Sequence, residues 1–249
     1  MLMGMAVLSV GPTVRPSDCQ SPRAANPERP TVATHAYTVA PGHAELEQGA
    51  RAFGVDGLRE GTAWDFNLKL GLVDGLQFGV FGAGYLRTSG GTGVGDLGGS
   101  LKWGRALTGR SAVALVPAVT VPTGDEGRGL GAGRALGSLV GVYSADLPAG
   151  VHFDFNAGPV GIGAGAGGPQ WFTSVGLARG VGGSVGVAFE LFDFTAGAAG
   201  PQQRGLLGAA LVTVVEWAVV DVGGVLGLTR LSPDQLFLGV TTNVGRIFK

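Results

Sequence analysis

Long stretches of alternating apolar and polar side chains are the feature that most constrains how this chain can fold. Residues 64–72 (WDFNLKLGL) place apolar side chains at every second position, and residues 96–103 and 151–157 repeat the pattern. Successive side chains of a β-strand point to opposite faces, so this period of two predicts strands with one apolar face. The expected strands span residues 43–53, 61–72, 76–85, 94–104, 111–121, 136–145, 151–161, 170–178, 183–194, 205–214, 217–228 and 236–248.

The length of these twelve segments favours a membrane over a soluble fold. A tilted strand needs ~9–11 residues to cross a bilayer, whereas strands of soluble proteins have about 5–6. Only 14% of the residues are charged and 45% are hydrophobic, against about 25% charged in ordinary globular domains. We therefore predict an all-β fold, a transmembrane antiparallel up-and-down β-barrel of about twelve strands.

A membrane helix is the competing interpretation of residues 205–228. This stretch contains Glu216 and Asp221, each of which costs ~2.5–3.5 kcal/mol near the centre of a membrane helix. It divides naturally into two strands, so we prefer the barrel. The basic and acidic side chains number 17 and 18, which gives no reason to expect nucleic acid as a partner.

The connections between the expected strands alternate in length. Short turns are expected at 73–75, 105–110, 146–150, 179–182 and 215–216, and longer loops at 54–60, 86–93, 122–135, 162–169, 195–204 and 229–235. Short turns at one end and long loops at the other are typical of barrels in the outer membrane of Gram-negative bacteria. The loops 122–135 and 195–204 are then expected at the cell exterior, and both termini at the short-turn end.

The residues before the barrel divide into two parts. Residues 1–18 include the apolar run 2–10 and are expected to be a targeting segment, or signal peptide. Residues 19–42 are rich in Pro and polar side chains, and we expect a flexible periplasmic segment or a plug for the barrel formed by residues 43–249. Cys19 is the only cysteine, which excludes an intramolecular disulfide bond.

Charged side chains on the polar phase of the strands are expected to face the lumen, because each would cost several kcal/mol in lipid. The candidates for transport lining are Asp65, Asn67, Lys69, Asp96, Lys102, Asp154, Asn156, Glu190 and Asp221. Two interpretations stay open: these residues line a transport path, or they form a network that holds the lumen closed. Lys69 and Lys102 are expected to pair with acids among Asp65, Asp96 and Asp221. The small residues Gly71, Gly98, Gly223 and Gly227 are expected to leave room in the lumen.

Aromatic residues gather near the ends of the expected strands, as in the girdles that membrane barrels place at the two interfaces. Trp64, Tyr85, Trp171, Phe192 and Phe194 are expected toward the long-loop end, and Trp103, Tyr143, Trp217 and Phe248 toward the short-turn end.

No pattern in the chain indicates catalysis, a cofactor or a metal site. The glycine-rich stretches lack the strand–loop–helix setting and the Gly-Lys-Ser/Thr sequence of a phosphate-binding loop. His152, Ser174 and Asn156 could form a hydrolase set in principle, but we interpret all three as polar lining. The three histidines show no ligand spacing. We therefore expect a protein that is not an enzyme.

Several short motifs, in order, resemble a known family of outer-membrane barrels. They are 36–39 (AYTV), 42–47 (GHAELE), 71–79 (GLVDGLQFG), 95–98 (GDLG), 102–103 (KW), 121–124 (VPTG), 190–192 (ELF), 221–223 (DVG), 232–234 (SPD) and Phe248. Over residues 36–248 the chain resembles the transporter family named for the meta-pathway of phenol degradation. This chain departs from it by carrying Lys249 after the aromatic residue. The resemblance implies an outer-membrane location and transport of small, often hydrophobic, molecules.

The expected function is a narrow, porin-like outer-membrane channel for small, hydrophobic or weakly polar solutes. Its expected partners are outer-membrane lipid, the barrel-assembly machinery during insertion, and the solute. A structural or adhesive barrel with a closed lumen is one alternative. A soluble secreted β-protein is another.

Overall fold

Twelve long antiparallel strands form almost the whole fold. The computed structural model describes residues 21–55 and 58–249. The long strands are β1 (His43–Val55), β2 (Leu58–Val73), β3 (Leu76–Thr88), β5 (Leu97–Thr108), β6 (Ser111–Val121), β7 (Leu136–Leu147), β8 (Val151–Ile162), β9 (Gln170–Gly182), β10 (Val185–Phe194), β11 (Gln203–Val215), β12 (Ala218–Gly227) and β13 (Asp234–Arg246). A three-residue strand, β4 (Gly91–Gly93), and two short 3-10 helices, η2 (Glu126–Arg128) and η3 (Pro148–Gly150), complete the described elements.

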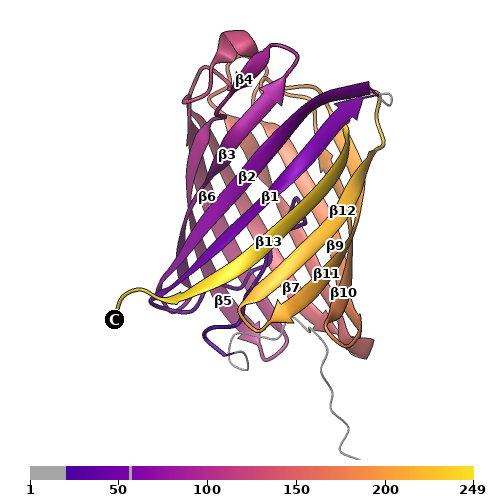
Figure 1. The fold of residues 1–249 in the computed structure, drawn as a ribbon. Helices are drawn as coiled ribbons and strands as arrows, with labels where there is room; N and C mark the ends of the chain where they lie inside the picture. Colours follow the sequence, from indigo (N-terminus) through magenta and orange to yellow (C-terminus); the bar gives the residue numbers. More distant parts are fainter. Residues whose placement is uncertain (1–20, 56–57) are drawn as a thin grey trace, which may run out of the picture.

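The sheet closes on itself. Each long strand pairs with its neighbours in the chain, β1 pairs with β13, and β2 pairs with both β1 and β3, so the sheet has no open edge between long strands (Figure 1). Closure matters in lipid, because an unpaired backbone group has no water to bind there. The predicted all-β barrel of twelve strands is confirmed.

Short connections lie at one end of the barrel and longer ones at the other, as expected, with one exception. Tight turns of two or three residues at 74–75, 109–110, 148–150, 183–184 and 216–217 occupy one end, and Gly75 adopts the positive φ of +71° that its turn requires. The terminal strands β1 and β13 meet at this same end, where His43 lies opposite Arg246. The predicted long loop 54–60 is wrong: β1 continues to Val55 and β2 begins at Leu58, because these strands extend beyond their neighbours.

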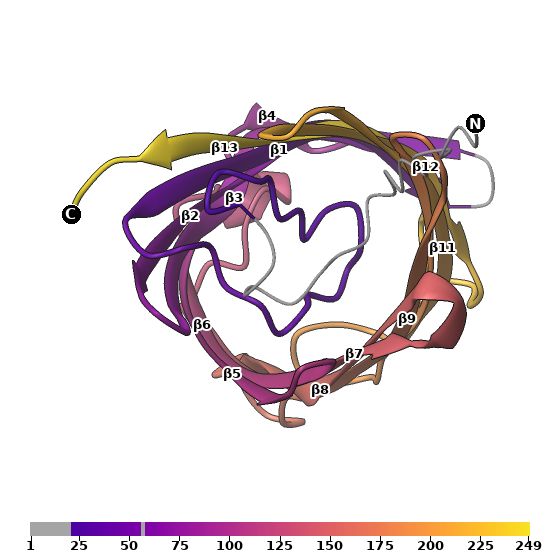
Figure 2. The same ribbon diagram turned by 90° about the horizontal axis from the view of Figure 1, so that it is seen from below.

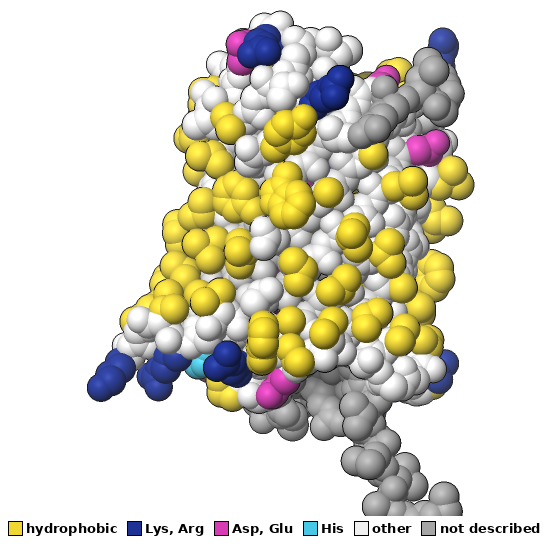
Figure 3. All heavy atoms as spheres, viewed as in Figure 1, with side chains coloured by type: hydrophobic (Ala, Val, Ile, Leu, Met, Phe, Trp, Pro, Cys, Tyr) yellow, Lys and Arg dark blue, Asp and Glu magenta, His cyan; other side chains and the backbone are white. Residues whose placement is uncertain are grey.

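The outer surface is apolar around a broad band (Figure 3). Leucine, valine and aromatic side chains are exposed there, among them Leu236 (74%), Phe189 (56%) and Leu226 (58%). Charged side chains gather above and below the band on the face shown in Figure 3. Together with closure, this surface defines a transmembrane barrel. In residues 21–55 and 58–249, no helix is both long and apolar enough to cross a membrane.

The N-terminal segment runs inside the barrel. Residues 21–42, here called the plug, loop inside the ring of strands (Figure 2) and lead into β1, which begins at the short-turn end. Ala36, Tyr37 and Val39 of the plug are buried against the wall. The expected targeting segment, residues 1–18, and Cys19 lie outside the described residues.

We predict that replacing a lipid-facing leucine by a charge will weaken the barrel. Leu68 lies on β2 with its side chain on the outer face, opposite to that of the buried Lys69. Leu68→Lys is expected to reduce the free energy of unfolding in lipid vesicles by ~2–4 kcal/mol, measured by urea titration. Thr92→Lys, in the exposed β4, is the control and should change stability little. Equal stability of both variants would show that Leu68 does not face lipid.

Candidate functional site

Wall carboxylates hold the backbone of the plug where it enters the lumen. Glu45 and Glu47 are adjacent inward-facing residues of β1, and both are almost fully buried. Glu45 accepts the Asn26 backbone N–H at 2.6 Å, and Glu47 accepts the Glu28 N–H at 2.6 Å. A buried backbone N–H group needs an acceptor, which in a sheet is the carbonyl group of a neighbouring strand. Here the two carboxylates are the acceptors.

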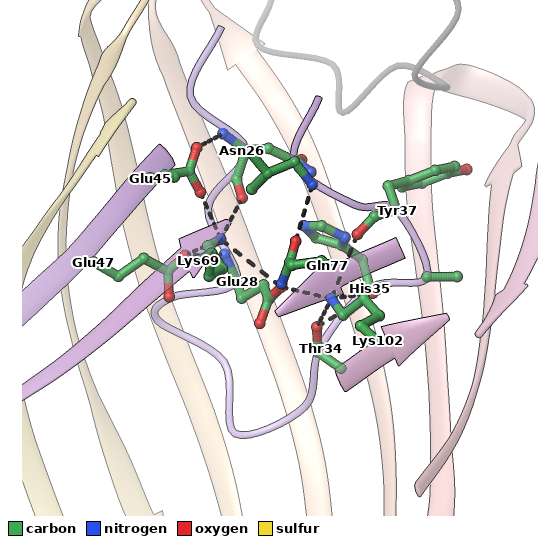
Figure 4. Close-up of polar contacts among 12 residues, drawn as sticks. Asn26, Glu28, Thr34, His35, Tyr37, Glu45, Glu47, Lys69, Gln77 and Lys102 are labelled. Atoms are coloured by element: carbon green, nitrogen blue, oxygen red, sulfur yellow. Dashed lines mark hydrogen bonds and ion pairs between the residues drawn. The ribbon is translucent and has the colours of Figure 1, made fainter. Parts of the chain in front are cut away.

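Two buried lysines connect the plug to the wall (Figure 4). The Lys69 ammonium contacts Glu45 and lies 2.8 Å from Glu47 and 3.0 Å from the Asn26 carbonyl. The Lys102 ammonium contacts Glu28 and donates to the His35 carbonyl at 2.8 Å. Glu28 is thus a plug residue that lies between two wall cations.

The surroundings of Glu28 stabilise the ionised form of its carboxyl group. Burial by itself would raise the pKa of its carboxyl group, but Lys102 and Lys69 outweigh burial and hold this pKa far below its usual value. The Gln77 amide adds a hydrogen bond to the same carboxylate at 3.2 Å. Glu28 therefore stays ionised throughout the physiological pH range, and the plug remains paired with the wall.

A second ion pair anchors the plug on the other side of the lumen. Arg29 contacts Asp221 of β12 at 3.3 Å. Its guanidinium group lies over two glycines that face each other across β1 and β13: a Cβ atom added at Gly49 or Gly239 would approach it to 2.6 or 2.5 Å. The absence of side chains at these positions makes the space that Arg29 occupies.

Polar wall residues bind the rest of the plug in turn. Glu190 accepts the N–H groups of Val32 and Ala33 at 2.7 and 2.9 Å. Asn156 makes two hydrogen bonds to the backbone of Thr34. Further along, Ser144 binds the Ala36 N–H and Gln77 binds the Val39 N–H. The plug backbone is thus satisfied by side chains from strands all around the barrel.

The wall on one side of the lumen is apolar instead. Phe172, Phe192, Leu207, Val225 and Phe237 form a buried cluster with Ala33 of the plug. The rings of Phe172 and Phe194 stack at 4.7 Å between centroids. The strands β9 to β13 contribute this phenylalanine cluster.

A histidine of the plug lies in a setting that keeps it neutral. Burial, with Lys102 close by, lowers the pKa of His35 to about 3. In the described part of the chain, neither ring nitrogen of His35 has a hydrogen-bond partner. Its ring neighbours Tyr37, which in turn lies 5.9 Å from the ring of His152.

The structure places most of the sequence-predicted lumen residues on the inner face. Lys69, Lys102, Asn156, Glu190 and Asp221 contact the plug, as described above. Asp154 binds Ser144 and His152, and Asp65 pairs with Arg51 of β1. Asn67 also faces inward, between Asp65 and Lys69 on β2.

Asp96 has a different role. It precedes β5 and accepts the N–H groups of Gly124 and Ala132 at 2.9 and 2.8 Å, so it binds loop 122–135 at the mouth of the barrel. The expected partners of the lysines are wrong as well. Lys69 pairs with Glu45, which lies directly opposite it on β1, and with Glu47 of the same strand. Lys102 pairs with Glu28, which comes within reach only when the plug is in place.

The four glycines expected to widen the lumen lie directly against other protein atoms. A Cβ atom at Gly71 would approach the Ala40 carbonyl of the plug to 2.2 Å, and one at Gly98 would meet the ring of Phe81. At Gly223 and Gly227 the neighbours are backbone carbonyls of Gly208 and Ser232. The predicted role of these four glycines is therefore wrong.

Seven of the nine aromatic residues assigned to the girdles are exposed on the barrel. They are Trp64, Tyr85, Trp103, Tyr143, Trp171, Trp217 and Phe248. Phe248 follows the end of β13. The girdle assignment is wrong for Phe192 and Phe194, which share the inner face of β10 with Glu190. Phe192 belongs to the phenylalanine cluster, and Phe194 packs against it. Phe192 lies two residues after Glu190, so the two side chains point to the same face of β10, and this spacing could have identified Phe192 as a lumen residue.

Sequence reasoning missed several residues that hold the plug. They are Glu28, Arg29, Glu45, Glu47, Gln77, Ser144 and Asn243. The alternation Glu45-Leu46-Glu47 is a signal that could have identified two of them. Glu28 and Arg29 carry no local pattern. Among residues 21–55 and 58–249, no group of His, Cys, Asp or Glu side chains is arranged to hold a metal ion.

A closed barrel with an apolar exterior and an internal plug defines an outer-membrane-type β-barrel. No family model and no curated protein matches the chain. The fold is similar to that of an outer membrane channel from Pseudomonas putida F1, with a TM-score of 0.61 and 15% identity over 84% of this chain and 97% of that one. It is also similar to the KdgM porin in complex with disordered oligogalacturonate, with a TM-score of 0.57 and 7% identity over 80% and 98%. At these identities the likeness shows the fold alone, and the resemblance to the meta-pathway family stays a prediction.

We predict that neutralising Glu28 will loosen the plug. Glu28→Gln leaves the buried Lys102 ammonium without its carboxylate, and breaking one side of a buried pair costs ~3–5 kcal/mol. The readout is thiol labelling of Ala33→Cys, a buried plug position, in a background where Cys19 is replaced by Ser. Labelling should accelerate in Glu28→Gln.

Two variants control this experiment. Glu126→Gln changes an exposed acid of η2 and should leave labelling unchanged. Adding Lys102→Met to Glu28→Gln removes the unpaired charge and should restore part of the protection. Unchanged labelling in Glu28→Gln would mean that this carboxylate does not retain the plug.

We predict that acid will loosen the plug through His35. The pKa of His35 is about 3 in the bound plug and 6.5 in water, so a released plug takes up a proton more readily. The contribution of His35 to plug binding is complete above pH 6.5 and is lost as the pH falls toward 3, by ~1.4 kcal/mol per unit. Hydrogen exchange of plug amides, corrected for intrinsic rates, should therefore accelerate from pH 7 to pH 5.

The matched variants for this prediction are two histidine replacements. His35→Phe should remove most of the pH dependence between pH 7 and pH 5. His43→Phe, near the exposed start of β1, should retain it. An unchanged pH dependence in His35→Phe would assign the effect to another group.

Proposed function

We propose that this protein is a gated channel in the outer membrane of a Gram-negative bacterium, which passes small, weakly polar or hydrophobic molecules. On this proposal the long-loop end, including loops 122–135 and 195–204, faces the cell exterior. The solute is the ligand, no cofactor takes part, and the protein is not an enzyme.

The observation that carries the proposal is the way the lumen is filled. A twelve-strand barrel lies between eight-strand barrels, which side chains fill, and porins of 16–18 strands, which hold a water channel. Here the space is occupied by a separate N-terminal segment, which many polar groups and the small apolar side chains of Ala33 and Ala36 join to the wall. Polar contacts can be exchanged for water when the plug moves, whereas a side-chain core cannot be opened without unfolding.

The phenylalanine cluster supports the choice of solute. Phe172, Phe192 and Phe237 belong to the same buried cluster as Ala33 of the plug, so displacement of this part of the plug would uncover an apolar wall. Such a wall suits a small aromatic or aliphatic molecule better than a sugar. A channel must also release its solute, and an apolar surface without matched hydrogen-bond donors binds weakly enough for that.

A structural barrel with a permanently closed lumen is the second candidate. The observation in its favour is the density of ion pairs at the plug, where Lys69 alone contacts two buried carboxylates. In either case the protein needs outer-membrane lipid, and we propose that the barrel-assembly machinery inserts it. The terminal Phe248-Lys249 is the segment to test for that interaction.

We predict that removing the plug will open a path for small aromatic molecules. Liposomes with the full chain and with a variant lacking residues 21–42 are compared for uptake of a small aromatic alcohol and of a disaccharide. The variant should admit the aromatic solute at least tenfold faster than the full chain, and faster than the sugar. Faster sugar entry would refute the solute class. No entry of either solute would favour the structural barrel.

A further inference from the structure

Arg29 of the plug occupies a recess that the sheet itself builds into the inner wall. Residues directly opposite each other on paired strands share a face of the sheet. One such row crosses β12, β13, β1 and β2 on the inner face, and it consists of Asp221, Gly239, Gly49 and Asp65. The two glycines carry no side chain, so the middle of the row is a hollow between two carboxylates. We call this hollow over Gly49 and Gly239 the glycine recess.

The guanidinium group of Arg29 enters the glycine recess with one edge. Its Nε and Nη2 atoms donate to the two oxygens of Asp221, at 3.3 Å each. The same two nitrogens lie 2.5 and 2.6 Å from the position of a Cβ atom added at Gly239, and the three nearest heavy atoms to that position all belong to Arg29. The recess therefore matches one guanidinium edge in both size and charge.

The contact between Arg29 and Asp221 is longer than such contacts usually are. Charge-assisted hydrogen bonds between nitrogen and oxygen are typically ~2.7–2.9 Å long, and both bonds here are 3.3 Å. Wall carboxylates bind the plug backbone at Glu28 and at Val32, on both sides of Arg29, which restricts how far its side chain can advance. The Arg29 side chain is 19% exposed, so solvent reaches the recess. A guanidinium group on a small molecule has no such restraint and can approach Asp221 more closely.

Asp221 depends on the plug for its ion pair. Among the residues that the structure describes, Arg29 is the only cation that pairs with Asp221, so departure of the plug leaves this carboxylate without a partner, which is costly where it is buried. Asp65, at the other end of the row, pairs with Arg51 of the wall and keeps its cation in either state. The recess thus offers one unmatched negative charge when Arg29 leaves it.

Two residues of β13 extend the recess along the strand. Thr241 follows Gly239 by two residues on the inner face; it is fully buried, and its hydroxyl group has no hydrogen-bond partner in the described part of the chain. Phe237 precedes Gly239 by two residues on the same face and belongs to the phenylalanine cluster. Two residues of a strand span ~7 Å. A ligand with its charged end in the recess can therefore place an apolar body against Phe237 and a further N–H group toward Thr241.

The chemistry of the recess favours a guanidinium group over other cations. A Ca²⁺ ion takes about six to eight oxygen ligands, whereas Asp221 is the one carboxylate of the row without a wall cation. An ammonium group is a point charge, but a guanidinium group donates two parallel hydrogen bonds to the two oxygens of a carboxylate. This is the geometry that Arg29 adopts on Asp221.

We propose that the glycine recess and Asp221 form a binding site for a small guanidinium compound with an apolar body, and that this ligand competes with Arg29 and releases the plug. The guanidinium edge of the ligand lies over Gly239 and donates to Asp221, and its apolar body lies against Phe237. The inference rests on the proposed function in one respect, because a gated channel needs a signal that displaces its plug.

Binding is measured by isothermal titration calorimetry of the full chain in a neutral detergent. The probe is benzylguanidinium, and benzylurea is its neutral isostere. Arg29→Gln should bind benzylguanidinium about tenfold more tightly than the parent, because apparent affinity falls with the fraction of protein in which the site is free. Adding Asp221→Asn should abolish this binding. Adding Asp193→Asn instead, at an acid that pairs with Arg204, should leave it unchanged. Equal affinities for benzylguanidinium and benzylurea would overturn the proposal.

Filling the recess tests its shape. In the Arg29→Gln background, Gly239→Ala places a methyl group where the Arg29 guanidinium lay, so this variant should fold and bind benzylguanidinium about tenfold less tightly. Gly176→Ala, on the inner face of β9, is the matched control: its added Cβ atom meets its nearest neighbour at 3.8 Å, and affinity should not change. Retention of a heat-dependent gel shift establishes that each variant is folded. Unchanged affinity in Gly239→Ala would show that the ligand does not lie in the recess.

Release of the plug is measured by thiol labelling of Ala33→Cys in the Cys19→Ser background, with the wall unaltered. Benzylguanidinium should accelerate labelling about threefold, and benzylurea should not. Arg29→Gln should label faster without ligand and gain nothing from it, because the competitor is gone. Binding to the parent without faster labelling would overturn the competition. Neither measurement needs solute flux, so a barrel that binds the ligand but conducts nothing would refute the channel and not this site.

Discussion

Two ammonium groups buried inside a narrow barrel determine how its lumen is filled. Lys69 and Lys102 would be costly in this place without anions, and the wall supplies only Glu45 and Glu47 within reach of Lys69. The remaining partner, Glu28, comes from the plug and contacts Lys102. The electrostatics of the wall is therefore complete only when the N-terminal segment is inside, which makes the plug part of the fold and not an appendage.

The same arrangement explains how a segment without regular secondary structure can be buried. A strand satisfies its backbone through its neighbours, but residues 21–42 belong to no strand. Glu47, Glu190, Asn156 and Ser144 take over this task, each from a different part of the wall. Polar residues that line a lumen are usually interpreted as contacts for a solute. Here they first bind the chain itself, and a solute would have to compete with the plug for them or pass along the apolar cluster.

The side chains on the exterior of the barrel differ in size from one region to another. Most of the lipid-facing surface carries large side chains, but β1 presents Ala50 and Ala52 between walls of leucine and tryptophan. This is the place where the first and last strands meet and the barrel closes.

The sequence by itself determined the barrel, because a period of two repeated over long, weakly charged segments has few other solutions. It also determined the inward phase of Lys69, Lys102 and Glu190, since a strand that turns one face to lipid leaves its charges only the other. The partners of those charges were decided by the tertiary structure alone. Glu28 and Arg29 lie in a segment without periodicity, and their contacts join residues up to 192 positions apart, Arg29 with Asp221. Phe192 shows the same limit: its aromatic character suggested a girdle, while its register opposite Ser174 places it inside. Local pattern specifies which face a residue occupies, but only closure of the barrel around the plug specifies what it meets there.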